Sequence, residues 1–70
     1  MAAKYWCGDV QPVSDFGSKI TDEFIDGATT TGPWGFMTPE EHAIHGRGLG
    51  QGRGQRYKKQ EDGRWLKVEG

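Results

Sequence analysis

A short chain with a single cysteine has few ways to hold a folded structure together. Cys7 is the only cysteine among the 70 residues, so no disulfide can form within the chain and a zinc site made of several cysteines is excluded. A chain of this length buries only about 60% of the surface that its unfolded form exposes. Packing, a partner molecule or a mixed metal site must therefore provide the stability that disulfides give to many small domains.

Aromatic residues are the main candidates for that packing. The chain contains three Trp, three Phe and two Tyr, although only 33% of its residues are hydrophobic and 12 are glycine. Each aromatic side chain can bury about 150–250 Å², so these residues are sufficient for a small core. No apolar run approaches the length needed to cross a bilayer, and residues 1–6 lack the apolar stretch of a secretory signal. We therefore expect a single cytoplasmic domain that does not enter a membrane.

The charged residues are divided unevenly along the chain. Residues 1–45 contain two basic and seven acidic residues, a net charge of −5, whereas residues 46–70 contain seven basic and three acidic residues, a net charge of +4. Such a division suggests an interaction surface in the second half. The alternative is that the two halves neutralise each other within the fold.

Turn residues divide the chain into two expected hairpins with a helix between them. Residues 22–27 and 34–37 predict short strands, and the Gly32-Pro33 turn between them allows an antiparallel pair. Residues 55–68 predict a second hairpin that turns at Asp62-Gly63. The expected fold is therefore a small α+β domain. Its expected parts are an N-terminal strand and loop (1–21), a hairpin plus short helix (22–45), a Gly/Arg-rich loop (46–54) and a C-terminal hairpin (55–69).

The start and stop signals of a short helix stand between the two hairpins. Thr38 suits the N-cap and Pro39 the first helical position, and acidic residues follow in the first turn. Thr38 and Glu41 also have the spacing of a capping box, in which each side chain accepts a hydrogen bond from the backbone N–H of the other residue. Gly46 is typical of the residue that ends a helix. We expect a helix within residues 38–46.

Glycine occupies every second position from Gly46 to Gly54, between this helix and the second hairpin. Glycine loses more backbone entropy on ordering than any other residue, so some feature of the fold or the function must require it here. The order helix, loop, strand is the reverse of the strand, loop, helix order of phosphate-binding loops, so we do not expect dinucleotide binding. The glycines predict either close packing around Leu49 or close approach to a partner.

Several of these motifs together resemble a family of small phage and prophage proteins. The resemblance covers about residues 7–69 and rests on Phe24-Ile25-Asp26-Gly27, Gly32-Pro33-Trp34, Met37, Gly48-Leu49-Gly50-Gln51-Gly52 and Gly54-Gln55-Arg56-Tyr57. Members of this family look like miniature treble-clef zinc modules, with one C-x-x-C near the N-terminus and another directly after the methionine. The resemblance therefore implies a degenerate treble-clef or zinc-ribbon-like fold.

The four positions that correspond to the family's zinc ligands hold Cys7, Val10, Thr38 and Glu41. Valine cannot bind a metal, so the usual closed four-ligand site is absent. The capping residues would fix the helix start in place of the metal. Capping contributes about 1 kcal/mol, against about 10–16 kcal/mol for a structural zinc ion. A permanent partner or additional packing must then compensate, and the candidates for packing are Trp6, Trp34 and Trp65.

A rearranged metal site is an alternative. His42 and His45 lie three residues apart on the expected helix, and the resemblance places Cys7 near the start of that helix. Thiolate and imidazole both suit zinc, and Asp9 or Glu41 could complete the set. The histidines are equally consistent with a favourable position near the C-terminal end of the helix dipole. We expect no cofactor and keep zinc as the alternative.

The sequence favours binding over catalysis. No residue pattern supplies a nucleophile together with an orienting group and an oxyanion site, and a chain of this size leaves little room for a small-molecule pocket. We therefore predict a macromolecule-binding module that is not an enzyme. The resemblance and the small size point to a host protein or complex that the module inhibits or modulates.

The predicted contact surface is the basic second half of the chain. Its candidate residues are Arg47, Arg53, Arg56, Tyr57, Lys58, Lys59 and Trp65. The alternative partner is a nucleic acid, with arginines of the Gly/Arg-rich loop on phosphates and Tyr57 or Trp65 stacked on a base. A sequence pI near 6.0 argues against a dedicated nucleic-acid protein.

Overall fold

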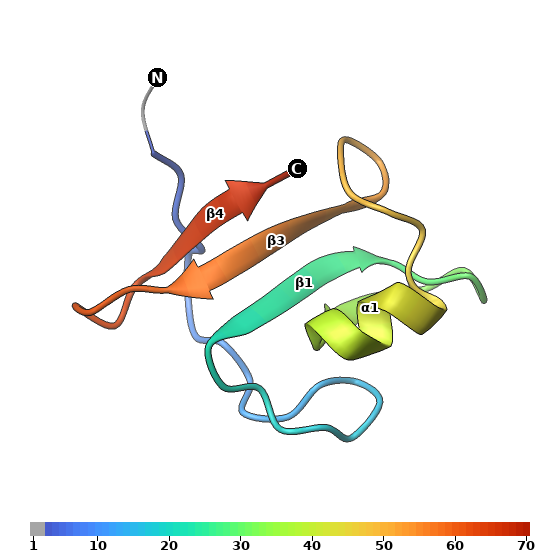
Figure 1. The fold of residues 1–70 in the computed structure, drawn as a ribbon, viewed down its shortest axis with the longest axis horizontal. Coiled ribbons are helices and arrows are strands. Elements are labelled where there is room, and N and C mark those ends of the chain that lie inside the picture. Colours follow the sequence, from blue (N-terminus) through green and yellow to red (C-terminus); the bar gives the residue numbers. More distant parts are fainter. Residues whose placement is uncertain (1–2) are drawn as a thin grey trace.

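Four short strands and one helix make up the fold (Figure 1). The computed structural model describes residues 3–70. The elements are β1 (Glu23–Ala28), β2 (Trp34–Met37), α1 (Pro39–His45), β3 (Gly54–Lys59) and β4 (Trp65–Glu69). The predicted α+β class and the predicted order of hairpin, helix and hairpin are therefore confirmed.

The two expected hairpins join into one antiparallel sheet with the strand order β2-β1-β3-β4. The joining pair is β1 and β3, in which Phe24 lies opposite Tyr57 and Gly27 opposite Gly54. A Cβ atom on Gly27 would lie 2.7 Å from the carbonyl oxygen of Arg53, so the close approach of the two backbones requires glycine there. This pairing connects residues distant in sequence and was not part of the predicted hairpin pattern.

Aromatic side chains cover one face of the sheet, which we call the aromatic face. Phe24 is fully buried at its centre. The rings of Phe36 and Tyr57 stack on either side of it, with centroids 4.8 and 5.1 Å away, and Trp65 meets it at 5.1 Å. The Trp6 ring lies across this row and meets Phe24, Phe36 and Tyr57 edge to face at 5.2–5.5 Å. Such pairs add about 0.5–1.5 kcal/mol each beyond the burial of their surface.

The helix α1 lies over β1 and β2 on the opposite face of the sheet (Figure 1). Side chains alternate between the two faces along a strand, so Ile25 and Met37 point away from the aromatic face, and both are buried. No residue of α1 is itself fully buried. The helix is thus a cover for the apolar residues of the sheet rather than a core element.

The predicted capping box at the start of α1 is confirmed. The Glu41 N–H donates to Thr38 Oγ1 at 3.2 Å, and the Thr38 N–H donates to Glu41 Oε1 at 3.0 Å. The end of the helix differs from the left-handed glycine that commonly follows a helix. Gly46 is extended, with φ −84° and ψ 172°. Glycine is needed there because a Cβ atom would collide with the ring of His42.

The N-terminal segment crosses the aromatic face and binds both outer strands of the sheet. At one end, the Trp6 N–H donates to the carbonyl of Trp65 in β4 at 2.9 Å. At the other end, the Asp15 N–H donates to the carbonyl of Phe36 in β2 at 2.9 Å, and the Phe36 N–H donates to the Asp15 carboxylate at 2.9 Å. These bonds reduce the number of unpaired groups on two edge strands. The strand expected within residues 1–10 is a single bridge at Tyr5.

Candidate functional site

The predicted basic contact residues lie in two groups at opposite ends of β3. Arg47 and Arg53 belong to the Gly/Arg-rich loop before β3, whereas Lys58 and Lys59 stand at its end. All four are exposed. At about 3.3 Å per residue, the length of β3 separates the groups by about 17 Å. The basic residues of the second half of the chain therefore lie in two groups about one strand length apart.

The other predicted contact residues are engaged within the fold. Arg56 Nε lies 2.6 Å from Glu23 Oε1, and Arg56 Nη1 lies 3.8 Å from Glu69 Oε1. Tyr57 and Trp65 belong to the half-buried aromatic cluster, and burial raises the pKa of Tyr57. These three residues, Arg56, Tyr57 and Trp65, therefore make contacts that stabilise the fold.

The Gly/Arg-rich loop has a defined backbone. The Ala28 N–H donates to the carbonyl of Arg53 at 2.8 Å, which joins the end of the loop to β1. His42 Nε2 lies 2.9 Å from the carbonyl oxygen of Gly48, which joins its beginning to α1. Left-handed φ values of +82°, +123° and +78°, which only glycine adopts readily, occur at Gly48, Gly50 and Gly52. The alternating glycines are therefore explained by the shape of the loop.

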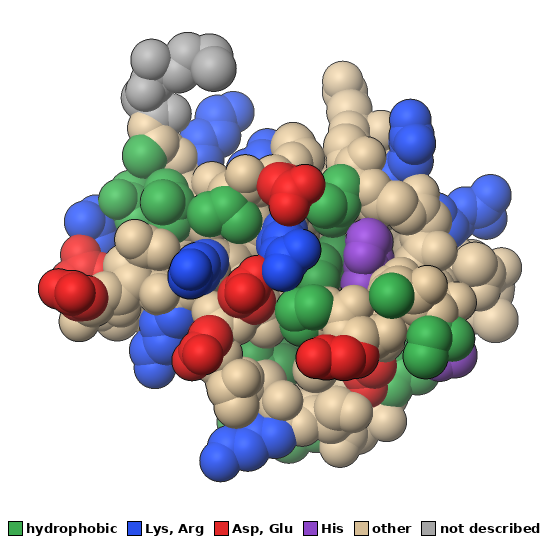
Figure 2. All heavy atoms as spheres, in the orientation of Figure 1, with side chains coloured by type: hydrophobic (Ala, Val, Ile, Leu, Met, Phe, Trp, Pro, Cys, Tyr) green, Lys and Arg blue, Asp and Glu red, His purple; other side chains and the backbone are tan. Residues whose placement is uncertain are grey.

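Three large apolar side chains are exposed at the end of the sheet where this loop lies, with Trp34 on the aromatic face, like Phe36, and Ile44 on α1 over the other face. Phe16, Trp34 and Ile44 have 45%, 49% and 72% of their surface exposed. The Phe16 ring stacks on the ring of His45 at the end of α1, with centroids 4.5 Å apart. Figure 2 shows hydrophobic and histidine side chains together over the region of α1. Trp34 is thus not the core residue that the sequence predicted.

The exposed apolar residues and the loop arginines lie at the same end of the sheet, next to the last residues of β1. Ala28 lies opposite Trp34 in the sheet, and its N–H donates a hydrogen bond to the carbonyl of Arg53. Two residues further along the chain, the Thr30 N–H donates to the carbonyl of His45 at 2.8 Å. In Figure 2, basic side chains project on the side of the Gly/Arg-rich loop. We call this region the loop end and define it by Phe16, Trp34, Ile44, Arg47 and Arg53.

Sequence reasoning identified the two arginines of the loop end but not its apolar members. Ile44 carried a weak signal, because it is the one large apolar residue in a short helix that is otherwise polar or small. Phe16 and Trp34 carried none, since the exposure of an aromatic residue depends on how the N-terminal segment and β2 pack.

The predicted metal ligands do not come together. Cys7 is exposed and follows Trp6 on the aromatic face, whereas His42 and His45 belong to α1 on the other face. Thr38 is occupied in the capping box. Within residues 3–70, no group of three or more His, Cys, Asp or Glu side chains is arranged to hold a metal ion. The rearranged zinc site is therefore not supported by the geometry.

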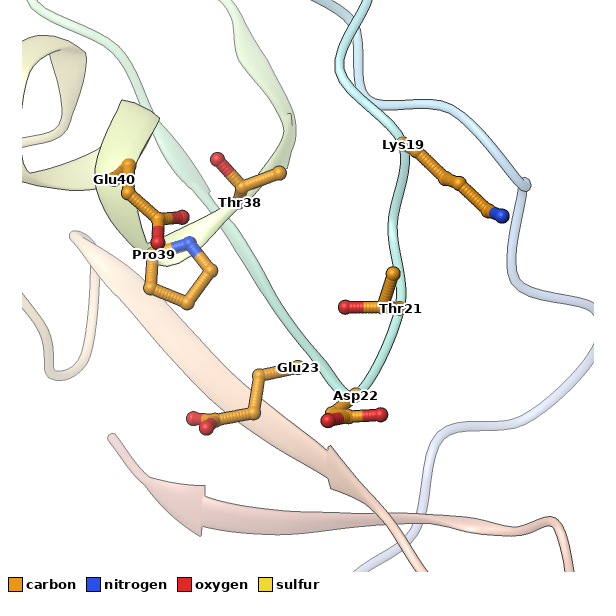
Figure 3. A pocket seen from close by; sticks show the side chains of 7 residues that line it. All are labelled: Lys19, Thr21, Asp22, Glu23, Thr38, Pro39 and Glu40. Carbon is orange, nitrogen blue, oxygen red and sulfur yellow. The ribbon is translucent and has the colours of Figure 1, made fainter.

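A polar hollow of about 180 Å³ lies between the start of α1 and the segment that leads into β1 (Figure 3). Thr38 and Glu40 face Thr21 across it, while the side chain of Lys19 points away. This volume is below the ~300 Å³ at which small-molecule pockets usually begin. A larger and more open hollow of about 460 Å³ lies at the turn after β3, and its lining residues are Tyr5, Gln60, Glu61 and Asp62.

Asp15 and Asp26 form a pair of carboxylates on the aromatic face that the sequence did not indicate. Burial raises the pKa of Asp26 above its ordinary value, and the nearby charge of Asp15 raises it further. Asp15 is held in place because its carboxylate accepts hydrogen bonds from the Phe36 N–H and from Gln11 Nε2 at 2.9 and 3.0 Å. Its position needs Gly35, where a Cβ atom would lie 2.6 Å from Asp15 Oδ2.

Comparison of the chain with protein-family models, with curated proteins and with solved structures finds no significant match. Over the part of the chain that the structure describes, none of the helices has the length and apolar character needed to span a membrane.

Proposed function

We propose that this chain is a small binding module and that its partner is another protein, which docks on the loop end. The observation that carries this proposal is the exposure of Phe16, Trp34 and Ile44 at the same end of the sheet as Arg47 and Arg53. Aromatic and arginine residues are enriched among the side chains that dominate the energy of protein–protein interfaces.

The exposure of these side chains has a cost for so small a domain. Full burial of a residue such as Ile44 contributes about 1.5–3 kcal/mol, and this chain leaves 72% of that residue in solvent. Only 33% of the residues are hydrophobic, so each one that stays exposed noticeably reduces the apolar surface available for the core. The high exposure of Ile44 beside the exposed loop arginines is better explained by a binding surface than by incomplete packing.

The biological setting of this proposal comes from the resemblance to small phage and prophage proteins. In that setting the module acts in the cytoplasm of a bacterial host cell. Its partner is then a host protein or complex that it inhibits or modulates. The loop end specifies the kind of contact, and the resemblance supplies the setting.

A matched pair of charge substitutions tests this proposal. Ile44→Asp places a carboxylate in the loop end, and Val68→Asp makes the same change at another exposed apolar residue, in β4. Immobilised wild-type and variant proteins are incubated with bacterial lysate, and captured proteins are identified by mass spectrometry. We expect Ile44→Asp to lose specific partners that Val68→Asp retains. Identical sets for all three proteins would exclude the loop end as the contact surface, provided that circular dichroism shows the same fold.

Nucleic acid is a second candidate partner because Arg47 and Arg53 are exposed on a glycine-rich loop. Fluorescence anisotropy with single- and double-stranded DNA and RNA at two salt concentrations tests this candidate. Affinity that falls steeply with salt would support it, since each phosphate contact releases counterions. A lack of binding at low salt would exclude it.

A further inference from the structure

We infer, on the basis of the proposed function, that the partner presents an acidic peptide segment to the loop end, with carboxylates that pair with Arg47 and Arg53 and an apolar side chain that packs beside Ile44. The partner's chemistry is thus a carboxylate-rich segment that also contains an aromatic or aliphatic residue. Charge complementarity of this kind fixes the orientation of a partner and raises its rate of association.

The arginines of this protein fall into two classes. Arg56 forms ion pairs with Glu23 and Glu69. Arg64 Nε lies 2.8 Å from Asp62 Oδ2, and its guanidinium covers the ring of Tyr5 at 4.2 Å. Among residues 3–70, the ion pairs and cation–π contacts include neither of the two loop-end arginines, Arg47 and Arg53.

The two loop arginines belong to a segment of the chain that contains no acidic residue. A Cβ atom on Gly48 would lie 3.8 Å from Arg53 Nη1, so the guanidinium of Arg53 lies alongside the residue that follows Arg47. No acidic residue occurs between Glu41 and Glu61. Carboxylates from a partner would be attracted to both of these positive charges.

The loop is already held in one conformation before a partner binds. Its beginning is fixed by the contact of His42 with the Gly48 carbonyl and its end by the bond of Ala28 to Arg53. A surface with a fixed backbone loses less entropy on binding than a flexible one. Arg47 and Arg53 therefore offer carboxylates a prepared position, although their side chains still have to be ordered.

Carboxylates fit this surface better than a phosphate backbone does. A nucleic acid extends its charge over many nucleotides, whereas the first 45 residues of this chain carry a net charge of −5 and would repel it. A peptide segment can place its acidic residues on the arginines alone and direct an apolar side chain towards Ile44, which is 72% exposed.

The experiment selects binders from a random displayed peptide library on four immobilised proteins. These are the wild type, the loop variant Arg47→Gln/Arg53→Gln, the control variant Lys58→Gln/Lys59→Gln with the same change of charge, and Ile44→Asp. We expect the wild type and the lysine control to enrich peptides that combine Asp or Glu with Trp, Phe or Leu. The best such peptides should bind the loop variant about tenfold more weakly, which corresponds to about 1.4 kcal/mol.

The outcomes separate this inference from the proposed function. Enriched peptides that lack acidic residues, or that bind the loop variant as tightly as the wild type, would overturn the inference, while their loss in Ile44→Asp would preserve the proposed function. A failure to enrich any peptide on the wild type would overturn the inference as well. Tight, salt-sensitive binding of a single-stranded oligonucleotide in place of peptides would assign the arginines to nucleic acid.

Discussion

The aromatic face and the loop end use the same kind of side chain for opposite purposes. On the aromatic face, Phe24 is fully buried between rings that lie about 5 Å away on either side. At the loop end, Phe16 and Trp34 have close to half of their surface in solvent. Residue type alone therefore does not separate the core of this chain from its candidate binding surface.

The largest effect on stability is expected from a substitution at the centre of the aromatic face. Phe24→Ala removes the ring at the centre of the aromatic face and should lower the free energy of unfolding by about 3–5 kcal/mol. Phe16→Ala, the same substitution at the loop end, should lower it by about 1 kcal/mol, because this ring is 45% exposed and stacks on His45. Urea unfolding followed by circular dichroism measures both values. Similar losses in the two variants would show that the loop end is part of the core.

A smaller effect is expected at the helix that carries Ile44. Thr38→Ala removes the hydroxyl that accepts the Glu41 N–H and should lower the free energy of unfolding by about 1 kcal/mol. The aromatic cluster lies on the face of the sheet opposite α1, so we expect the near-ultraviolet circular dichroism of the native variant to match that of the wild type. A collapse of that signal would contradict the independence of the two regions. Thr38→Ser, which keeps the hydroxyl, is the matched control.

The pH dependence of stability probes the carboxylate within the aromatic face. Because burial raises the pKa of Asp26, the folded protein takes up this proton before the unfolded chain does as the pH falls. The ionised Asp26 therefore lowers stability at neutral pH, and this penalty disappears as the pH falls through the raised pKa towards the ordinary value of 3.8. Asp26→Asn should be more stable than the wild type at neutral pH, by less than the capping effect. The difference should shrink across that window in thermal unfolding, and a difference independent of pH would contradict the assignment.

The smallest effect on stability is expected at Trp34. Trp34→Phe should leave the free energy of unfolding within about 0.5 kcal/mol of the wild type. It should nevertheless remove the most accessible tryptophan, because Trp6 and Trp65 are half-buried in the aromatic cluster. Acrylamide should then quench the remaining fluorescence less efficiently. Unchanged quenching would place Trp34 in the interior, as the sequence first suggested.

Local signals in the sequence predicted the local structure well. The helix was predictable because Thr38, Glu41 and Gly46 act within a few residues of one another, and β2 was predicted at residues 34–37. The pairing of β1 with β3 was not predictable, since glycine at Gly27 and Gly54 signals close backbone approach without naming its partner. The path of the N-terminal segment was not predictable either, because its hydrogen bonds to Trp65 and Phe36 join residues that are distant in sequence.

The candidate site was predicted less completely than the fold. The sequence indicated Arg47 and Arg53 because basic residues near glycines stand out. Arg56 has the same composition signal, yet its position in β3 opposite β1 gives it an ion pair with Glu23. Whether a charged residue forms an ion pair within the fold depends on strand register, which the sequence of a single chain does not reveal.

The N-terminal segment that reaches β4 has a consequence for how the protein is made. Trp6 leaves the ribosome early, but the carbonyl it binds belongs to Trp65, 59 positions later in the chain. Contacts between residues so far apart in sequence form late and slow the folding of a small domain. During synthesis the Trp6 ring can meet Phe24 and Phe36 first, but its backbone bond and the last ring of the cluster, Trp65, are added only after β4 has been made.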